Sequence, residues 1–465
     1  MNQLGVILLA AGQGTRMKSA VPKVLHSLGG KALFLHVLEN ARRLDPAIIA
    51  IVVGHAARSV QDAGPAKDIN WAIQEEQLGT GHAVLCAQDK FHEFAGDILI
   101  LSGDVPLIQE QTLRTMIEHQ RSSRADLSFL TAQLDNPNGY GRILRDAEGA
   151  VTGIIEEKDA TDEQRQISEI NTGIYVVSSP FLFDALAAVK NHNQQKEYYL
   201  TDIVAIALRQ KKKVEAVQIN DVRETLGINS REDLAKMEKS LRDKINQKWM
   251  LAGVTLQDPD TTYIEETVTI GQDTIIGPNT HLKGKTVIGE RCHIDGTAFL
   301  TDMEIGDDVL LKFSVVMTGS RIDGGAIVGP FAHLRPGTHL GRNVHIGNFV
   351  EAKAAHVGEG TKANHLTYLG DVTIGRDTNI GAGTITCNYD GFGKYRTVIG
   401  EGAFIGSNTA LVAPVSVGEG AIVGAGSVIT RDVDADSLAV ERNEQKGIAG
   451  WARRFRERMT RKAAE

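Results

Sequence analysis

The sequence predicts an α/β domain followed by a parallel β-helix built from hexapeptide repeats. Two periodic patterns carry this prediction. In the first half, short apolar runs alternate with amphipathic helical segments; this alternation is typical of a mostly parallel sheet covered by helices. In the second half, apolar residues recur at every sixth position over three long runs. A fixed period of this length indicates a parallel β-helix.

The first half contains three near-continuous apolar runs, which we predict to be strands buried on both faces: 6–9, 48–53 and 98–101. Between them, segment 31–44 forms a predicted helix with one apolar face, which carries Leu33, Val37, Leu38 and Ala41. Ligands of such sheets bind beyond the carboxyl ends of the strands. The residues that follow each strand are therefore the candidate functional residues. We assign 1–229 to this domain and the highly charged segment 230–250 to a connecting helix.

The repeats of the second half place apolar residues at Ile270, Ile276, Leu282, Ile288, Ile294, Leu300, then at Ile322, Val328, Leu334, Leu340, Ile346, and finally at Ile399, Ile405, Leu411, Val417, Val423 and Ile429. We expect each unit to form a short strand and a turn, with the apolar residue inside. A glycine often follows, at a corner where a side chain would clash or φ is positive. The repeat domain is assigned to 251–442. The tail, 443–465, has a basic, helix-like pattern that either closes a ligand site or forms a solvated face.

Composition restricts the function. The chain has 465 residues and a formal net charge of −8, which argues against an unspecific nucleic-acid binder. Its cysteines, Cys86, Cys292 and Cys387, are isolated in sequence, as expected in a reducing compartment. The apolar run 4–11 is too short for a signal peptide, and no run approaches the roughly 20 apolar residues of a membrane span. We expect a cytoplasmic protein with neither nucleic-acid nor membrane partners.

A glycine-rich segment, 9–17, directly follows the first strand, and Pro22-Lys23 lies just downstream. Glycines let backbone N–H groups approach phosphate oxygens, and Arg16 and Lys23 can neutralise the charge. The segment is neither a P-loop nor GxGxxG, because Met17 replaces the third glycine; a nicotinamide-dependent dehydrogenase is therefore disfavoured. On the glycines alone, a tight strand–helix turn is an equal alternative. The two cations favour phosphate binding.

With these residues, the first half resembles the sugar-1-phosphate nucleotidyltransferases, which implies a Rossmann-like fold. The resemblance implies that UTP and the UDP-sugar are bound by Leu9, Ala10, Gly12, Lys23, Gln74, Gly79, Thr80, Gly141, Glu156, Asn171 and Asn229. It implies catalytic roles for Lys23 and Arg16, and a Mg²⁺ site formed by Asp104 and Asn229. A carboxylate and an amide oxygen suit a hard cation that keeps several waters. An isolated Asp after a strand is otherwise a helix cap or a turn residue.

Polar motifs interrupt the low-charge repeats at 335–337, 351–353, 365–371, 379–384 and 388–394. In this order they resemble the bifunctional N-acetylglucosamine-1-phosphate uridylyltransferase/glucosamine-1-phosphate N-acetyltransferase family, so the resemblance covers nearly the whole chain. It implies a left-handed β-helix and a homotrimer. It also implies an amino-sugar phosphate site formed by Arg335, Lys353, Tyr368 and Asn379, and an acetyl-CoA site formed by Ala382, Asn388, Tyr389, Ser407, Ala425 and Arg442.

The family's general base corresponds to His365. An ammonium must lose a proton before its nitrogen attacks a thioester, and imidazole is a suitable base near neutral pH. The resemblance thus implies acetyl transfer from acetyl-CoA to glucosamine-1-phosphate, followed by uridylyl transfer from UTP with release of pyrophosphate.

Two alternatives remain open. The first is a sugar-1-phosphate nucleotidyltransferase whose β-helix is only structural, against which stand the loop 388–394, His365 and Tyr368. The second is a trimeric scaffold with degenerate sites, which would bind ligands without turnover.

Overall fold

The computed structural model describes residues 3–64, 67–442 and 444–463. It divides into two compact units, Met1–Leu241 and Arg242–Glu465, which are described separately. The division falls within helix α8 (Arg231–Leu251), in the segment where the sequence suggests a connecting helix. The predicted domain limits at residues 1, 443 and 465 lie outside the described residues.

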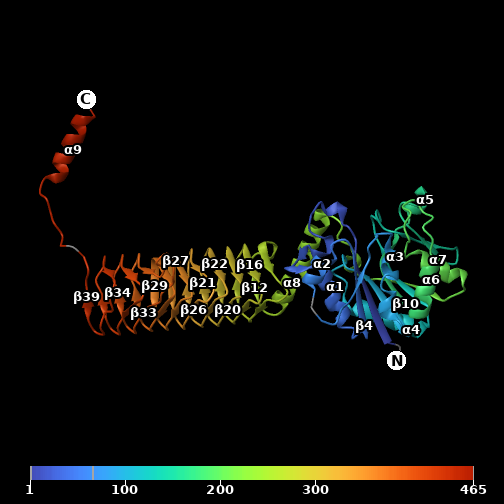
Figure 1. Ribbon diagram of the computed structural model, residues 1–465, viewed down its shortest axis with the longest axis horizontal. Helices are drawn as coiled ribbons and strands as arrows, with labels where there is room; N and C mark the ends of the chain where they lie inside the picture. The colour runs from blue at the N-terminus through green and yellow to red at the C-terminus, as the bar shows by residue number, and fades with distance from the viewer. Residues whose placement is uncertain (1–2, 65–66, 443, 464–465) are drawn as a thin grey trace. The chain divides into compact units, whose positions relative to one another are not determined.

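The first unit is an α/β domain (Figure 1). Its strands are β1 (Gln3–Ala10), β2 (Ser27–Leu28), β3 (Lys31–Ala32), β4 (Ile48–Val53), β5 (Asn70–Ile73), β6 (Gly96–Ser102), β7 (Leu127–Gln133), β8 (Arg142–Arg145), β9 (Val151–Ile155), β10 (Glu169–Ser178) and β11 (Val214–Gln218). Its helices are α1 (Leu33–Arg42), α2 (Ala57–Ala63), α3 (Thr80–Leu85), α4 (Glu110–Ser123), α5 (Asp162–Arg165), α6 (Ser179–Ala188) and α7 (Asp202–Arg209), with 3₁₀ turns η1 (Thr15–Met17), η2 (Lys23–Leu25), η3 (Gln88–Phe91) and η4 (Val222–Thr225).

The main sheet has the order β11-β7-β10-β6-β1-β4-β5. The three predicted strands are confirmed as the adjacent strands β4, β1 and β6, which pair in parallel. The predicted helix 31–44 is α1, which begins later because Lys31–Ala32 pairs with Ser27–Leu28 as a short hairpin. Strand β10 runs antiparallel to both β6 and β7, so the sheet is mixed. The apolar pattern that predicts a buried strand carries no information about its direction.

The sheet is covered on both faces. Alternate residues of β1 enter two different apolar clusters: Val6 and Leu8 pack with α1 and α4, whereas Ile7 packs with α3, α6 and α7. Burial on both faces explains why the central strands are continuously apolar rather than alternating. It also leaves the ends of the strands as the accessible places for polar groups.

The second unit stacks short strands coil upon coil (Figure 1). They are β12 (Thr255–Leu256), β13 (Thr262–Ile264), β14 (Thr269–Ile270), β15 (Ile275–Ile276), β16 (Thr280–Lys283), β17 (Val287–Ile288), β18 (His293–Ile294), β19 (Ala298–Thr301), β20 (Glu304–Ile305), β21 (Leu310–Leu311), β22 (Val315–Thr318), β23 (Arg321–Ile322), β24 (Ile327–Val328), β25 (His333–Leu334), β26 (His339–Leu340), β27 (His345–Lys353), β28 (His356–Val357), β29 (Lys362–Gly370), β30 (Val372–Ile374), β31 (Asn379–Ile380), β32 (Ile385–Cys387), β33 (Thr397–Ile399), β34 (Phe404–Ile405), β35 (Ala410–Val412), β36 (Val415–Val417), β37 (Ile422–Val423), β38 (Val428–Ile429) and β39 (Leu438–Ala439), with the 3₁₀ turn η5 (Pro259–Thr261).

The parallel β-helix predicted from the six-residue period is confirmed. Strand β16 pairs in parallel with β19, β19 with β22 and β22 with β25, so each turn comprises three strands. All 17 apolar residues of the predicted repeats are buried, from Ile270 to Ile429.

The glycines that follow the apolar residues are needed because neighbouring coils are close. A Cβ at Gly271 would lie 2.6 Å from the backbone nitrogen of Glu290, and one at Gly406 would lie 2.4 Å from that of Ala425. Neither glycine has a positive φ. Of the two reasons expected from the sequence, crowding therefore applies at these positions.

After the last coil, residues 451–462 form helix α9 (Trp451–Lys462), whose side chains are all exposed. A search of the described residues finds no helix that is both long and apolar enough to cross a membrane.

Candidate active sites

The first candidate site lies at the carboxyl ends of β1 and β6, where the structure brings four of the predicted residues together. The Lys23 ammonium donates to the Asp104 carboxylate and, at 3.2 Å, to Asn229 Oδ1. Arg16 Nη2 donates to the same amide oxygen at 2.9 Å. The side chains of Lys23 and Asp104 are only 13% and 20% exposed, so their charges interact in a partly desolvated place.

Local hydrogen bonds explain how each residue reaches this cluster. Pro22 directly precedes η2, which begins at Lys23. The Ile228 N–H donates to the Asp104 carbonyl at 2.9 Å, which holds the chain before α8 against the end of β6. One Asp233 carboxylate oxygen then accepts from the N–H groups of Asn229 and Ser230 at 3.0 and 2.8 Å. This cap stabilises the start of α8 and fixes Asn229 beside Asp104.

Asp104 and Asn229 fit the donor set expected for Mg²⁺. A Cβ placed at Gly227 would lie 3.9 Å from Asp104 Oδ2 and 3.6 Å from Asn229 Nδ2, so the two side chains converge beside a residue that leaves space. Within the described residues there is no group of three or more His, Cys, Asp or Glu side chains that could hold a metal. Two oxygen ligands are sufficient for an ion that keeps waters and bridges substrate phosphates.

The predicted base-binding residues lie beside the glycine-rich segment. Gln74 is 3% exposed, and its Nε2 is 3.1 Å from both the Gly79 carbonyl and His82 Nδ1, which orients the amide. Gly79 has φ 109°, and a Cβ there would lie 2.7 Å from the Tyr198 carbonyl. Thr80, next along the chain, accepts the Leu200 N–H at 3.1 Å.

A cavity of about 440 Å³ opens beside this segment. It is lined by Ala10, Ala11, Gly12, Gln13, Gly14, Thr15, Lys18, Ser19, Ala20, Val21, Pro22, Gly54, His55, Ala56, Val60 and Gln77. Gln77 was not among the predicted site residues. Its Nε2 donates to the Ala11 carbonyl at 2.6 Å, and this bond joins the predicted base-binding stretch to the glycine-rich segment. Leu9 lies in β1, one residue before Ala10, which lines the cavity. The Leu9 carbonyl accepts the Gly103 N–H at 2.9 Å.

The three predicted sugar-binding residues are neighbours. The Asn171 N–H donates to the Gly141 carbonyl at 2.8 Å, and a Cβ at Gly141 would lie 3.5 Å from Glu156 Oε2. Thr201 donates to the other oxygen of Glu156 at 3.0 Å. Burial raises the pKa of Glu156, and the nearby carboxylates of Asp202 and Asp159 raise it further. This carboxyl therefore takes up a proton more readily than an exposed Glu, which suits hydrogen bonding to a neutral sugar.

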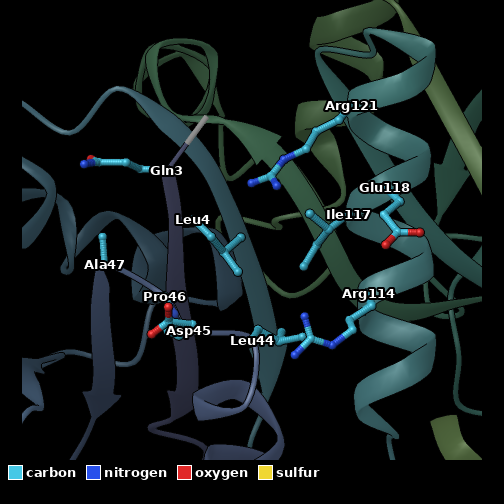
Figure 2. A pocket seen from close by; sticks show the side chains of 10 residues that line it. All are labelled: Gln3, Leu4, Leu44, Asp45, Pro46, Ala47, Arg114, Ile117, Glu118 and Arg121. Atoms are coloured by element: carbon cyan, nitrogen blue, oxygen red, sulfur yellow. The ribbon is translucent and has the colours of Figure 1, made fainter. Parts of the chain in front are cut away.

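A second cavity of the first unit, about 450 Å³, contains none of the predicted site residues (Figure 2). It lies where β1 and β4 begin, beside α4, and its lining includes Arg114 and Arg121. Both cations have carboxylate partners, because Arg114 Nε is 2.7 Å from Glu110 and Arg121 Nε is 3.0 Å from Asp97. Functional groups of parallel sheets gather at the other end of the strands, so we do not assign this cavity an active site.

The second unit has a cluster of cations on successive coils. Arg335 follows β25, and its N–H donates at 2.8 Å to the carbonyl of Ala352, the residue before Lys353. The Lys394 ammonium adjoins that of Lys353 and lowers the pKa of Lys353, as does Arg335 nearby. Glu351 partly balances the cluster through an ion pair of 2.8 Å with Arg335 Nη1. Such a cluster suits a phosphate dianion.

His365, in β29, has one ring nitrogen engaged. Its Nδ1 lies 3.0 Å from Asn348 Oδ1, on the preceding coil. An amide oxygen only accepts, so the hydrogen is on Nδ1 and the lone pair of the neutral ring is on Nε2. This is the tautomer required if Nε2 is to act as a base.

Three of the predicted acetyl-CoA residues form a column along the coils. The Ala382 carbonyl accepts the Asn408 N–H at 2.7 Å, and the Ser407 carbonyl accepts the Gly426 N–H at 2.8 Å. Arg442 Nη1 closes the column by donating to the Ala425 carbonyl at 2.8 Å. His365 adjoins the first member of the column, because its carbonyl accepts the Gly383 N–H at 3.2 Å.

The inserted loop after β32 carries the remaining pair. Asn388 is buried and donates to the Asp371 carboxylate at 2.5 Å, whereas Tyr389 is 61% exposed. Asp390 closes the loop by accepting the N–H groups of Phe392 and Gly393 at 2.8 and 2.7 Å.

The structure does not bring every predicted acetyltransfer residue together. Tyr368 pairs in register with Glu351, and Asn379 with Lys362, so both lie on the same stack of coils. Among the described residues, however, no hydrogen bond or ion pair joins His365 to Arg335 or Lys353. Sequence reasoning missed Asn348, Glu351 and Lys394 as site residues. Asn348 and Glu351 lie about one coil from their partners, 17 residues from His365 and 16 residues from Arg335, and this spacing was a usable signal. Lys394, in the inserted loop, has no such spacing.

Both halves of the chain match models of known protein families. Residues 6–204 match the MobA-like NTP transferase domain, and residues 267–302 and 396–431 match the bacterial transferase hexapeptide model. Three relatives are each called bifunctional protein GlmU. The relative from Geotalea uraniireducens is 49% identical over 97% of this chain and 99% of its own. The relative from Pelobacter propionicus is 48% identical over 98% and 100%, and that from Streptococcus suis is 47% identical over 97% of each chain. At this identity over nearly the full length, the chain belongs to the family of bifunctional GlmU proteins.

Proposed function

We propose that the chain makes UDP-N-acetylglucosamine in two steps. The second unit transfers an acetyl group from acetyl-CoA to glucosamine-1-phosphate, and the first unit transfers a uridylyl group from UTP to the acetylated product. Family membership over nearly the full length supports both reactions. The single observation that carries the proposal is His365, whose Nδ1 is held by Asn348 so that Nε2 is the base. A purely structural coil has no need of this arrangement.

In the uridylyl step, a phosphate oxygen of N-acetylglucosamine-1-phosphate attacks the α-phosphorus of UTP. The new P–O bond forms as the bond to pyrophosphate breaks, and no proton has to move because the attacking oxygen is already anionic. Two anions must meet, so charge stabilisation is the main task of the protein. Lys23 and Arg16 are proposed to supply it, while Gln74 and Gly79 hold the base and Gly141, Glu156 and Asn171 hold the sugar.

Asp104 and Asn229 are the residues proposed to hold Mg²⁺, which when bound neutralises phosphate charge. In the structure, the Lys23 ammonium lies between these two oxygens. We propose that Lys23 turns to the phosphates when the ion and UTP enter.

In the acetyl step, the ammonium of glucosamine-1-phosphate first loses one proton to water. As the free amine attacks the thioester carbonyl, His365 Nε2 takes a second proton from its nitrogen. The C–S bond then breaks, and the coenzyme A thiolate receives that second proton from His365. Arg335, Lys353 and Lys394 are proposed to hold the phosphate, with Tyr368 and Asn379 on the sugar. Ala382 contributes its backbone N–H to the developing oxyanion. Asn388, Tyr389, Ser407, Ala425 and Arg442 are proposed to bind acetyl-CoA.

We propose that three copies assemble through the β-helix. Support comes from an exposed apolar column beside His365, formed by Phe313, Phe331, Phe349 and Leu366, which are 47–63% exposed. The rings of Phe331 and Phe349 stack with centroids 5.4 Å apart. A contiguous exposed apolar surface is typical of an interface. A neighbouring copy would also bring further groups to His365, which among the described residues has no hydrogen bond or ion pair with Arg335 or Lys353.

The trimer is tested by sedimentation equilibrium. We expect a mass of three chains, and expect Phe331→Glu to dissociate it and to abolish acetylation while uridylylation persists. Val287→Glu changes an exposed residue (47% exposed) of β17. This strand belongs to the sheet β14-β17-β20-β23-β26-β28-β30-β33-β36, not to the sheet of β27 and β29 that contains Phe349 and Leu366, and the substitution should have no effect. Dissociation by Val287→Glu alone would place the interface on the sheet that contains β17.

We also place the reactions in the cytoplasm. The cysteines Cys86, Cys292 and Cys387 are all free thiols, which supports a reducing compartment.

Two assays on the full-length protein test the function. The first measures thiol release from acetyl-CoA with glucosamine-1-phosphate, and the second measures pyrophosphate release from UTP with N-acetylglucosamine-1-phosphate. We expect both products. Pyrophosphate without thiol would identify a nucleotidyltransferase with a structural β-helix. Ligand binding without either product would identify a scaffold.

A further inference from the structure

The most deeply buried charged side chain of the first unit is Arg142, at the start of β8. It has no exposed surface and is the largest fully buried side chain in the described chain. Removing a guanidinium from water is costly unless its N–H groups are bonded and its charge is paired. The arrangement of these partners therefore reveals what the side chain holds in place.

Arg142 bonds to residues on both sides of the adjacent turn. Its Nη1 donates to the Tyr140 carbonyl and, at 3.1 Å, to Glu157 Oε2. Its Nη2 donates to the Arg165 carbonyl at 3.3 Å. The same Glu157 oxygen accepts the Gly139 N–H at 2.5 Å. Arg142 and Glu157 thus clamp the turn 139–141 through its Gly139 N–H and its Tyr140 carbonyl.

The clamped turn belongs to the proposed sugar site. The Gly141 carbonyl accepts the Asn171 N–H at 2.8 Å, and Gly141 packs against the Glu156 carboxylate, the residue adjacent to Glu157. Between them, Tyr140 lies close to Asp104 and to the backbone of Gly227. The turn therefore contacts the proposed sugar-binding residues and lies near Asp104, one of the proposed metal ligands.

Stability alone gives little reason for this ion pair. Replacing a buried ion pair by apolar groups of similar volume is often neutral or stabilising. What a multiply bonded guanidinium supplies is a fixed geometry. Glycine at both 139 and 141 makes the turn intrinsically mobile, so an external clamp is needed to hold it in one conformation.

We propose that Arg142 and Glu157 are positioning residues for uridylyl transfer: together they fix the turn 139–141 against Glu156 and Asn171, so that the sugar phosphate is held in line for attack. The inference rests on the proposed uridylyl transfer and adds two residues to it. Neither residue touches the substrate.

The test uses Arg142→Met and Glu157→Gln in the full-length protein. Arg142→Met keeps a long apolar side chain without the positive charge. Glu157→Gln removes the negative charge of the partly exposed partner. We expect KM for N-acetylglucosamine-1-phosphate to rise and its kcat/KM to fall by about tenfold to a hundredfold, since a misplacement near 1 Å can reduce the rate this much. KM for UTP should change less than about twofold, because Gln74 and the glycine-rich segment lie outside the clamp.

The chain offers a matched control on the same strand. Arg145, at the end of β8, forms a two-bond ion pair with Glu169 at 2.8 and 2.7 Å, but it does not contact the turn. Arg145→Gln should leave both KM values unchanged. Acetylation, in the other unit, is a second control and should remain at the wild-type rate in every variant.

The outcomes distinguish failure of the proposed uridylyl transfer from failure of the positioning role alone. If wild-type protein releases no pyrophosphate, the proposed function fails. If wild-type protein is active and Arg142→Met and Glu157→Gln behave like Arg145→Gln, only the positioning role is wrong. Thermal unfolding of each variant is measured alongside. A lowered melting temperature with unchanged KM values would make the clamp purely structural and overturn the inference.

Discussion

The two candidate sites both contain clusters of cations, but they are assembled in opposite ways. In the α/β unit, Arg16, Lys23, Asp104 and Asn229 come from three segments as far as 213 residues apart. In the β-helix, Arg335 and Lys353 lie on adjacent coils, and Asn348 and His365 are 17 residues apart. A sheet thus gathers a site from distant segments at its strand ends, whereas a solenoid gathers it by stacking one turn on the next.

The charge balance of the sites differs too. Lys23 is paired with Asp104, whereas Lys353 is adjacent to another cation, Lys394. The first site therefore has carboxylate and amide oxygens ready for a divalent ion. The second has excess positive charge that only an anion relieves. From this difference we expect uridylylation to depend on a divalent metal ion, and acetylation to depend on the spacing between Lys353 and Lys394.

The sharpest way to separate the sites is His365→Ala. Loss of a general base typically costs a factor of about 10²–10⁴, so we expect acetylation to fall by this much and uridylylation to stay at the wild-type rate. Residual acetylation should increase with pH as more of the amine becomes free. Asn348→Ala should cause a smaller loss of acetylation, because the base remains but its tautomer is no longer fixed. Equal loss of uridylylation would refute the independence of the units.

Metal dependence is the next contrast. Asp104→Ala should lower uridylylation by about 10²–10³, comparable to removing a group that stabilises transition-state charge, with acetylation unchanged. Chelation of divalent ions should reproduce this pattern in the wild-type protein, and added Mg²⁺ should reverse it. Acetylation that is equally sensitive to chelation would contradict the proposed difference between the sites.

A third prediction concerns cation spacing. Lys394→Ala removes a charged hydrogen-bond donor worth about 1.5–3 kcal/mol, so KM for glucosamine-1-phosphate should rise by about tenfold to a hundredfold. Because Lys394 lowers the pKa of Lys353, its removal raises that pKa. Lys353 then stays charged to higher pH, and the loss of substrate affinity at alkaline pH should shift upward. If KM of the Lys394→Ala variant rises at the same alkaline pH as KM of the wild-type protein, Lys353 and Lys394 do not interact.

The smallest expected effect is on stability rather than activity. Arg145 lowers the pKa of Glu169 by hydrogen bonding to its carboxylate. Since the folded-state pKa lies below the unfolded one, this stabilisation is complete above the unfolded pKa and is lost as pH falls through the folded value. In Arg145→Gln, acid unfolding of the first unit should therefore begin a fraction of a pH unit higher. Circular dichroism during acid titration measures this, with unfolding of the second unit as the reference.

The sequence predicted the parts of the fold that depend on burial. The six-residue period locates the buried residues of the β-helix because each coil has the same environment. Continuous apolar runs locate β1, β4 and β6 for the same reason. Strand β10 was not among the predicted strands, and its antiparallel direction could not be read from an apolar pattern because the same burial serves either direction. Helix α1 begins later than predicted because a hairpin pairing overrides the helical pattern at Lys31.

The sites were less predictable because they depend on contacts between distant residues. Family motifs pointed to Lys23, Asp104 and His365. They did not point to Asn348, which matters only through the coil stacked beside it, or to Gln77, which matters through one bond to Ala11. Arg142 was beyond sequence reasoning altogether, since an arginine is usually exposed and only the packed structure reveals its burial at the start of β8, where it pairs with both β9 and β10.

The column of Ala382, Ser407, Ala425 and Arg442 has a consequence for how ligand length is selected. Adjacent strands are separated by about 4.8 Å, so Ala425, two coils beyond Ala382, lies about 10 Å along the stack. The Arg442 guanidinium is bonded to the Ala425 carbonyl and therefore lies near the same level. If acetyl-CoA binds along this column as proposed, the number of coils sets the distance between its thioester and its charged group. Inserting or deleting one whole coil of three strands would keep every side chain facing the same way while changing the accepted length by a fixed increment.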